Sequence, residues 1–393
     1  MSLISSPPVV QNPRAAGFDV SIAVSSLATA RVEYGFAPDD LAFTARASHH
    51  GLVAASDRAL QIPVRHHDIL PPGKPIYYRV VVESLCYHDA YRLERGEPQV
   101  TPVHALRLPR HDMPRVRIVS INDTHGNLPS IRSLHHQIEE LQPDLLVMNG
   151  DTCNYFGAED APEQILLNPA SDTALAWAAT RPLIFSNGNH DIRGERAREL
   201  AECLAPAPES TELPFNQAIR FGPLALVVLD TGEDKPDHHP VFAGTAAYEP
   251  YRERQAAWLA AALHQPAIGE APFKLAFTHI PLRGLPGQPD GTTLDDYARY
   301  SGDGARLWLP LLRDSGCNAI ISGHTHHPRH DPPTASMPVH QFVGGGPRSE
   351  EPEEATLTII EAEADNAQAS ALIRIVSLHG QELFSQSFDW TPA

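Results

Sequence analysis

The chain has 393 residues, 42% of them hydrophobic and 20% charged, which is enough to bury two or three separate cores. Its net charge is −18, from 48 acidic and 30 basic residues, and no run of basic residues occurs. Because binding to nucleic acid needs a basic face, this composition argues against nucleic-acid recognition as the main activity.

The cysteines and the apolar segments give no sign of a disulfide scaffold or of a membrane anchor. No two of the four cysteines form a CxxC pair, which also argues against a structural zinc module. The N-terminal sequence lacks the basic and apolar segments of a signal peptide, and no apolar run approaches the ~20 residues that span a bilayer. We therefore expect a soluble, cytoplasmic protein with no membrane partner.

Short β-rich runs separated by turn residues fill the chain before residue 110. Strands at this spacing, without a stretch of helical periodicity, predict an antiparallel β-sandwich. We expect an N-terminal tail at 1–12, the sandwich at 13–109 and a linker at 110–116. The expected strands are 20–25, 30–34, 41–45, 61–69 and 76–84.

Strands and helices alternate after residue 115, which predicts a layered α/β domain over 117–390. The expected strands are 116–123, 144–151, 224–230, 274–281 and 317–327, with a strand plus loop at 182–191 and closing strands at 339–343, 356–363 and 371–377. The expected helices are 131–141, 174–180, 195–204, 252–264 and 305–314.

Five polar clusters stand at the C-terminal ends of the apolar strands, where open α/β sheets place their ligands. In chain order they are Asp123-Thr124-His125, Gly150-Asp151, Gly188-Asn189-His190-Asp191, Thr278-His279-Ile280-Pro281 and Gly323-His324-Thr325-His326. Each cluster alone is explained by a cap, a turn or a core histidine. Together they would need five unrelated accidents at equivalent positions, so we favour a functional site.

The residue types in these clusters indicate a metal centre. Nitrogen and oxygen ligands without thiolate suit Mn, Fe or Zn better than Mg or Ca. Seven candidate ligands are too many for one ion, but they suit two ions that share a carboxylate. Two metals about 3.5–4 Å apart form the clamp that proteins use for in-line displacement at phosphorus.

The ordered motifs D-x-H, G-D, G-N-H-D, T-H-x-P and G-H-T-H resemble those of the calcineurin-like metallophosphoesterase superfamily over residues 115–350. The resemblance implies an α/β fold in which two sheets pack face to face with helices outside, a four-layer α/β/β/α sandwich. It also implies a hydrolase that cleaves small-molecule phosphate esters by attack of a metal-bound hydroxide at phosphorus.

The resemblance assigns two divalent or trivalent ions, of Mn, Fe or Zn, to the clusters. The first ion takes Asp123, His125 and His326, and Asp151 bridges both ions. The implied ligands of the second ion, besides the bridge, are Asn189, His279 and His324.

Two further residues are implied to act beside the metals. His190 would donate to the phosphate or protonate the leaving oxygen, and Asp191 would orient His190. Arg193 and Arg283 are weaker candidates for holding a phosphate oxygen, because a surface salt bridge explains them as well. Loop residues just after the 224–230 strand have an equally open role, as solvated loop or as substrate contacts: Asp234, Asp237, His238 and His239.

The segments ATARVEYG (28–35) and ILPPGKPIYYRV (69–80) resemble the fibronectin-III-like domain that precedes the catalytic domain of purple acid phosphatases. Those enzymes lack the histidine of the first motif and use a tyrosine three residues after the bridging aspartate. This chain keeps His125, and Tyr155 lies four residues after Asp151. The difference favours a phosphodiesterase. A phosphomonoesterase and a non-catalytic binding or scaffold protein of the same fold remain alternatives. We expect specificity to come from loops 157–170, 231–248 and 283–300.

Overall fold

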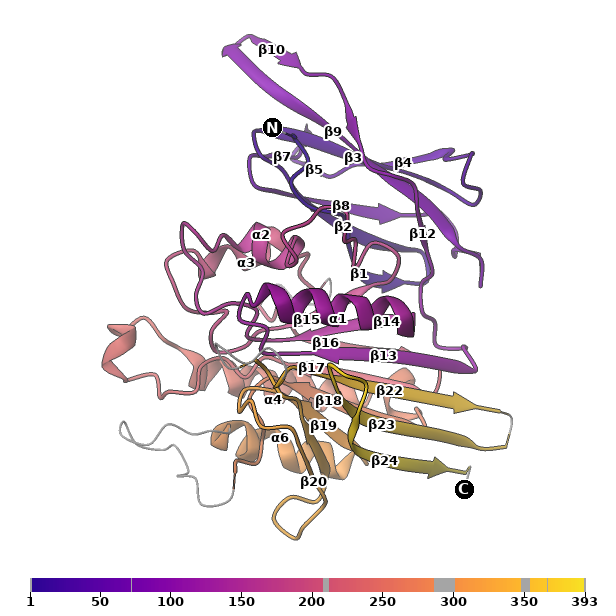
Figure 1. Ribbon diagram of the computed structural model, residues 1–393, viewed down its shortest axis with the longest axis vertical. Helices are drawn as coiled ribbons and strands as arrows, with labels where there is room; N and C mark the ends of the chain where they lie inside the picture. Colours follow the sequence, from indigo (N-terminus) through magenta and orange to yellow (C-terminus); the bar gives the residue numbers. More distant parts are fainter. Residues whose placement is uncertain are drawn as a thin grey trace.

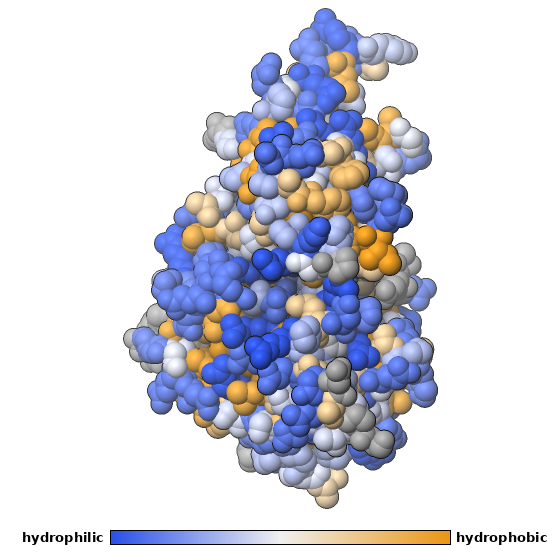
Figure 2. All heavy atoms as spheres, turned by 90° about the vertical axis from the view of Figure 1, so that its right-hand side faces the viewer, coloured by the Kyte–Doolittle hydropathy of each residue, from blue (hydrophilic) through white to orange (hydrophobic). Residues whose placement is uncertain are grey.

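The computed structural model describes residues 2–71, 73–207, 212–285, 301–347, 354–365 and 367–391. An all-β N-terminal part lies at one end of the molecule, and a larger α/β part forms the rest (Figure 1). Figure 2 shows one face of the molecule, which hydrophilic side chains largely cover and apolar side chains interrupt in small patches. No helix among the described residues is long and apolar enough to cross a membrane.

The N-terminal part consists of antiparallel strands around one apolar core. Strand β3 alternates between buried and partly exposed residues, the pattern of a strand with one face on a core. One sheet has the order β1 (Val9–Arg14), β2 (Gly17–Ala23) and β8 (Ala59–Arg65). The other has the order β10 (Arg92–Arg95), β9 (Ile76–Asp89), β3 (Ala28–Gly35) and β4 (Phe43–Ala45). In this second sheet β7 (Ala55–Ser56) also pairs with β3, and β11 (Gln99–Val100) and β12 (His104–Leu106) pair with β9.

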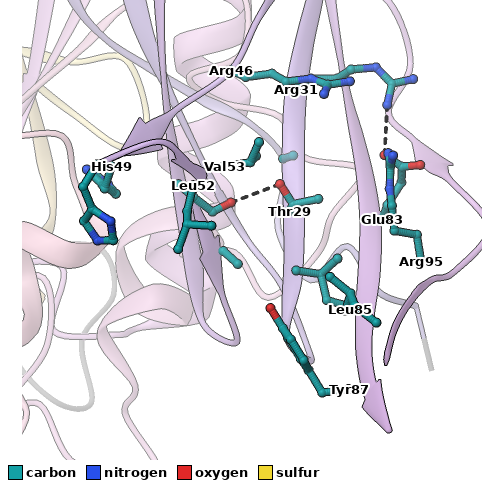
Figure 3. A pocket seen from close by; sticks show the side chains of 15 residues that line it. Thr29, Arg31, Arg46, His49, Leu52, Val53, Glu83, Leu85, Tyr87 and Arg95 are labelled. Atoms are coloured by element: carbon teal, nitrogen blue, oxygen red, sulfur yellow. Dashed lines mark hydrogen bonds and ion pairs between the residues drawn. The ribbon is translucent and has the colours of Figure 1, made fainter. Parts of the chain in front are cut away.

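A cavity of about 460 Å³ lies on the outer face of this second sheet, beside a small hairpin formed by β5 (Ser48–His49) and β6 (Leu52–Val53). Its walls combine apolar side chains such as Leu52 and Tyr87 with Arg31, Arg46 and Arg95 (Figure 3). All of its lining residues belong to the N-terminal part, so the cavity is separate from the strand ends that carry the polar clusters.

The α/β part contains two six-stranded sheets, each of which combines parallel and antiparallel strand pairs. The first sheet has the order β15 (Leu183–Ser186), β14 (Leu145–Asn149), β13 (Arg115–Ile121), β22 (Thr356–Ala364), β23 (Ala369–Ser377) and β24 (Glu382–Trp390). The second has the order β16 (Gln217–Phe221), β17 (Leu224–Leu229), β18 (Phe273–Thr278), β19 (Ala319–Ser322), β21 (His340–Val343) and β20 (Arg329–Asp331).

The cores show that the α/β part has four layers, as expected. One core joins the two sheets, with Ile118 and Val147 from the first and Phe277 from the second. Strands buried on both faces are apolar along their whole length, as β17 is. The helices cover the outer faces (Figure 1). They are α1 (Leu128–Leu141), α2 (Pro162–Leu167) and α3 (Leu200–Cys203) on the first sheet's side, and α4 (Tyr248–Leu263), α5 (Pro266–Gly269) and α6 (Gly302–Asp314) on the second's.

Two expectations from the sequence are wrong. Residues 174–180 form turns instead of a helix, and residues 9–12 belong to β1 instead of a tail. The N-terminal part uses the carbonyl groups of this stretch as acceptors: Val10 N donates to Ala178 O at 2.9 Å, and Tyr78 Oη donates to Ala179 O at 2.8 Å.

Candidate metal centre

The five polar clusters lie at neighbouring strand ends of the two sheets. Asp123 follows β13, Asp151 follows β14, and the Gly188–Asp191 cluster follows β15, all in the first sheet. His279 directly follows β18, and the His324–His326 cluster follows β19, in the second sheet. Because the sheets pack face to face with these ends at one edge, residues up to about two hundred positions apart come into contact, as His125 and His326 do.

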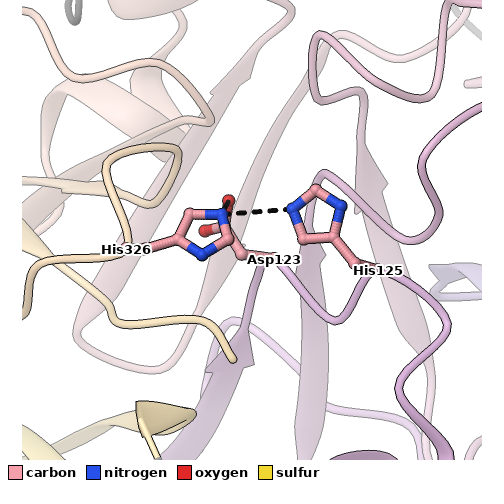
Figure 4. Close-up of side chains that lie close together, drawn as sticks. All are labelled: Asp123, His125 and His326. Carbon is pink, nitrogen blue, oxygen red and sulfur yellow. Dashed lines mark hydrogen bonds and ion pairs between the residues drawn. The ribbon is translucent and has the colours of Figure 1, made fainter. Parts of the chain in front are cut away.

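Asp123, His125 and His326 form a first group whose ligand atoms all lie within 4.8 Å of one another. Nε2 of His326 is 3.4 Å from Asp123 Oδ1, and the Nε2 atoms of His125 and His326 are 3.1 Å apart (Figure 4). The other ring nitrogen of His125 lies 3.1 Å from Asn154 Oδ1. A proton on that nitrogen leaves the Nε2 lone pair facing the group, which suits a metal ligand.

Asp151, His279 and His324 form a second group, also within 4.8 Å. Nε2 of His279 lies 3.2 Å from Asp151 Oδ2 and 3.9 Å from Asp123 Oδ1, so the ring faces both carboxylates. Asn189 joins this group, with its Oδ1 atom 2.8 Å from His324 Nδ1. All seven residues expected as ligands therefore lie together, and the second group adjoins the first.

The two buried carboxylates of this cluster need a positive charge to balance them. Asp123 and Asp151 are 0% and 1% exposed, and no lysine or arginine among the described residues pairs with either carboxylate. Burial raises the pKa of both carboxyl groups, but the surrounding histidines outweigh it and hold both below their ordinary value. Burial likewise opposes a charge on His279, yet the charges of Asp151 and Asp123 raise the pKa of His279 to about 10.

The histidines also fit metal ligation. His279 Nδ1 lies 2.7 Å from Asn149 O, to which it donates, whereas its buried Nε2 has no hydrogen-bond partner among the described residues. A buried ring nitrogen that faces two carboxylates without a hydrogen bond is the kind of atom that a metal ion would satisfy. Burial lowers the pKa of His324 to about 3, so its ring is neutral, the form that binds metals.

The backbone of the centre is strained. Asp123, His125, Asp151, His324 and His326 all have positive φ angles, between 44° and 70°. Asp and His tolerate this left-handed conformation better than most residues, but each instance still costs free energy. Strain concentrated on five candidate ligands supports a functional role for this edge of the sheets. The sequence showed no sign of it.

Two glycines of the motifs are explained by close packing. A Cβ atom on Gly188 would lie 2.1 Å from Asp151 Oδ1, and one on Gly323 would lie 2.4 Å from Asp123 Oδ2. Both distances are far below van der Waals contact. Glycine at these positions therefore lets one polar loop lie directly against the carboxylate of another.

Asp191 does not contact the ring of His190, contrary to the expected orienting role. Its Oδ2 atom accepts from Asp151 N and Gly188 N, both at 2.8 Å, and its Oδ1 atom accepts from Thr152 N at 2.9 Å and from Thr152 Oγ1 at 2.5 Å. Four donors fill the acceptor sites of a carboxylate, so none remains for His190. Asp191 instead ties the loops after β14 and β15 together.

His190 is oriented by other groups, which the sequence did not reveal. Its Nδ1 atom lies 2.9 Å from Asn154 O, and its backbone N donates to Asp151 Oδ1 at 2.8 Å. The Arg193 guanidinium lies next to its ring and also pairs with Glu233. Glu233 carries no motif and is 40 residues from Arg193, so only the folded chain shows this pair.

Two of the other weak candidates have structural partners. Asp237 caps α4 by accepting from Tyr248 N and Glu249 N, which is a structural role. Arg283 donates its backbone N to Gln341. Most of the expected specificity loop 283–300 lies outside the described residues.

Comparisons with known proteins show similarity in sequence and in fold. The sequence profile of the calcineurin-like phosphoesterase family matches residues 116–328. A purple acid phosphatase from yellow lupin (Lupinus luteus) seeds shares the fold, with a TM-score of 0.59 and 12% sequence identity over 97% of this chain and 73% of that one. A dimetal phosphatase from Danio rerio matches with a TM-score of 0.49 and 16% identity over 72% of this chain and 100% of that one. A comparison with curated proteins found no match.

The fold and the paired carboxylate–histidine groups define a metallophosphoesterase. The chain belongs to the calcineurin-like phosphoesterase family and is a metal-dependent phosphoester hydrolase.

Proposed function

We propose that the chain binds two metal ions of the Mn, Fe or Zn type and hydrolyses small-molecule phosphate esters. The observation that carries this proposal is the convergence of seven ligand-type side chains from both sheets on two buried carboxylates that lack an arginine or lysine partner among the described residues. Asp123, His125 and His326 would hold one ion, and Asn189, His279 and His324 the other, with Asp151 between them.

The ions and the protein would contribute differently. When bound, such ions polarise phosphoryl oxygens and lower the pKa of a bound water to about 7. The carboxylates and the histidine rings would fix where the ions sit. His190, held at Nδ1 by Asn154 O, presents Nε2 as the protein's own polar group at this edge. Because Asn154 O holds the Nδ1 proton, Nε2 would donate to a phosphoryl oxygen or to the leaving oxygen from the doubly protonated ring.

We further propose that phosphodiesters are the preferred substrates. The support is His125, which occupies the first group as a neutral ligand, its pKa lowered by burial. A neutral histidine in the first motif is the feature that separates this chain from the purple acid phosphatase pattern. Phosphomonoesters are the second candidate, because the centre itself sets no limit on the number of ester groups.

Elemental analysis of the purified protein, paired with hydrolysis of bis-p-nitrophenyl phosphate and p-nitrophenyl phosphate under added Mn²⁺, tests the proposal. We expect about two metal ions per chain, as the clamp requires, and faster turnover of the diester. Faster turnover of the monoester would overturn the diester preference alone. Absence of both metal and turnover would overturn the enzyme and favour a scaffold protein of this fold.

The role of His190 has its own test. Replacing it with alanine (His190→Ala) should lower turnover by about 100-fold or more while metal content stays unchanged. The loss should be larger for an ester with an alkyl leaving group than for a p-nitrophenyl ester, since p-nitrophenolate leaves readily without a proton. Equal losses for both esters would remove the leaving-group role and keep only a contact to the phosphoryl group.

A further inference from the structure

Arg193 lies three residues after His190 on the loop that follows β15, and the surrounding chain holds it firmly. Its carbonyl accepts from Phe156 N at 2.9 Å, and its backbone N donates to His190 O at 3.1 Å. Its side chain donates twice to Glu233, from Nε at 2.9 Å and from Nη2 at 2.6 Å. A bidentate pair of this kind fixes the plane of the guanidinium as well as its position.

Glu233 is itself fixed, so the pair is rigid on both sides. Its side chain is 1% exposed. Its backbone carbonyl accepts from Arg252, whose Nε also donates to Thr231 O at 2.9 Å. The loop after β17 therefore holds the carboxylate that in turn holds Arg193 on the loop after β15.

The third guanidinium nitrogen of Arg193, Nη1, lies against the ring of His190. This atom is 3.3 Å from Nδ1 and 3.1 Å from Nε2. One atom cannot approach both nitrogens in the plane of the ring, because the carbon between them stands in the way, so Nη1 lies over a face of the ring. With Nδ1 held by Asn154 O, the ring can neither tilt toward Arg193 nor turn about its axis.

The net charge around Arg193 is close to zero. Asp234 and Lys235 join Arg193 and Glu233, with Lys235 Nζ 2.6 Å from Asp234 Oδ1 and Arg193 Nη2 3.4 Å from the same oxygen. Two acidic and two basic side chains cancel. Arg193 therefore adds little to the attraction of an anionic substrate, and what remains is its effect on the orientation of His190.

We propose that Arg193, locked by Glu233, is a positioning residue that holds the His190 ring so that Nε2 faces the reacting phosphoryl group. This inference rests on the proposed function, because it assigns a partner to His190 in that reaction. The proposed role of Arg193 does not depend on the residues that would bind metal. A positioning role predicts a loss in kcat with little change in KM, since orientation matters most in the transition state.

The conservative substitution separates geometry from charge. Lysine keeps the positive charge but lacks the planar fork that binds Glu233 twice and covers the ring. We therefore expect Arg193→Lys and Arg193→Met to lower kcat by a similar factor, about 10- to 100-fold, with KM changed by less than about threefold. Recovery of most of the activity in Arg193→Lys would overturn the positioning role and indicate a role of charge.

A double-mutant cycle with His190→Ala tests whether Arg193 acts through His190. The matched control is Arg196→Met. Arg196 is three residues further along the same loop and pairs with two carboxylates, those of Glu163 and Glu199, but has no contact with His190. Metal content and Tm are measured for every variant, and turnover is measured with bis-p-nitrophenyl phosphate and with a diester that has an alkyl leaving group.

We expect Arg193→Met to lower kcat at least about 10-fold in the native background and less than about twofold when His190 is already alanine. The control should have no effect on kcat in either background. Equal losses in both backgrounds, or no loss in either, would overturn the inference. If Arg193→Met lowers Tm or metal content, the same double-mutant cycle is measured with Glu233→Gln. This substitution weakens the ion pair between Glu233 and Arg193 but keeps the Arg193 side chain. An inactive native protein would instead refute the proposed function.

Discussion

Replacing Asp191 with asparagine tests how strongly this carboxylate ties together the loops after β14 and β15. Asp191 is fully buried and accepts four hydrogen bonds from the loops after β14 and β15. Burial and the nearby charge of Asp151 raise the pKa of Asp191 to about 6, so at about pH 7.5 the ionised form predominates. Asparagine keeps the shape but turns one of the two acceptor oxygens into a donor.

The least costly arrangement of the new amide decides the magnitude. If the NH2 group replaces Oδ2, the backbone N–H groups of Asp151 and Gly188 both lose their acceptor. If it replaces Oδ1, only the Thr152 N–H loses its acceptor, because the Thr152 hydroxyl can turn and accept. One buried unsatisfied N–H costs about 1–3 kcal/mol, and the other bonds lose the assistance of a charge, so we expect a loss of about 2–4 kcal/mol.

Thermal unfolding measures this loss. At about 2–4 °C per kcal/mol for a domain of this size, Tm of Asp191→Asn should fall by about 4–16 °C. The matched control is Asp365→Asn: this exposed aspartate also accepts from two backbone N–H groups, but water can replace it, so its change should stay within about 0.5 kcal/mol. Metal content should fall as well, because Asp191 fixes the backbone of Asp151. Equal Tm values for the two variants would refute the reasoning.

Three other changes have definite outcomes. Asp151→Asn removes the carboxylate that we propose lies between the two ions and should lower the metal content measured by elemental analysis to well below half of the native value; full occupancy would contradict that bridging role. Gly188→Ala places a Cβ atom 2.1 Å from Asp151 Oδ1 and should also displace metal, whereas Gly157→Ala, whose nearest atom is a flexible side chain at 3.3 Å, should not. Burial would raise the pKa of Glu33, but hydrogen bonds from its two arginine partners hold it below 4.5. The stability that this group contributes is therefore present above about pH 4.5 and lost as the pH falls through its lowered value. Tm of Glu33→Gln should lie below that of the native protein at about pH 6, and the difference should narrow as the pH falls below 4.5. A difference that stays constant in acid would refute this assignment.

Several helices and strands could be predicted because their patterns are local. The apolar run of β17 and the periodic apolar positions of α1 depend only on neighbouring residues. The turns at 174–180 could not be predicted, since the donors that occupy their carbonyls come from residues 10 and 78. The position of the domain boundary near 110–116 stays a prediction, because β1 pairs within the N-terminal part and also contacts the turns before β15.

The residues of the candidate centre could be proposed from the sequence because each follows an apolar strand, and parallel strands end at a common edge. Asp191 shows the limit of that inference. Its place in the motif suggested a partner for His190, whereas the fold surrounds it with four donors from other loops.

The sequence by itself determined which chemistry the protein carries, since the carboxylates, histidines and glycines of the five clusters are written in the chain in a fixed order. Tertiary structure alone decided which of these groups face one another. His279 meets Asp123 and Asp151 only because the two sheets pack face to face. Arg193 meets Glu233 only because the loops after β15 and β17 lie side by side. Such contacts depend on packing between distant segments, which no local pattern encodes.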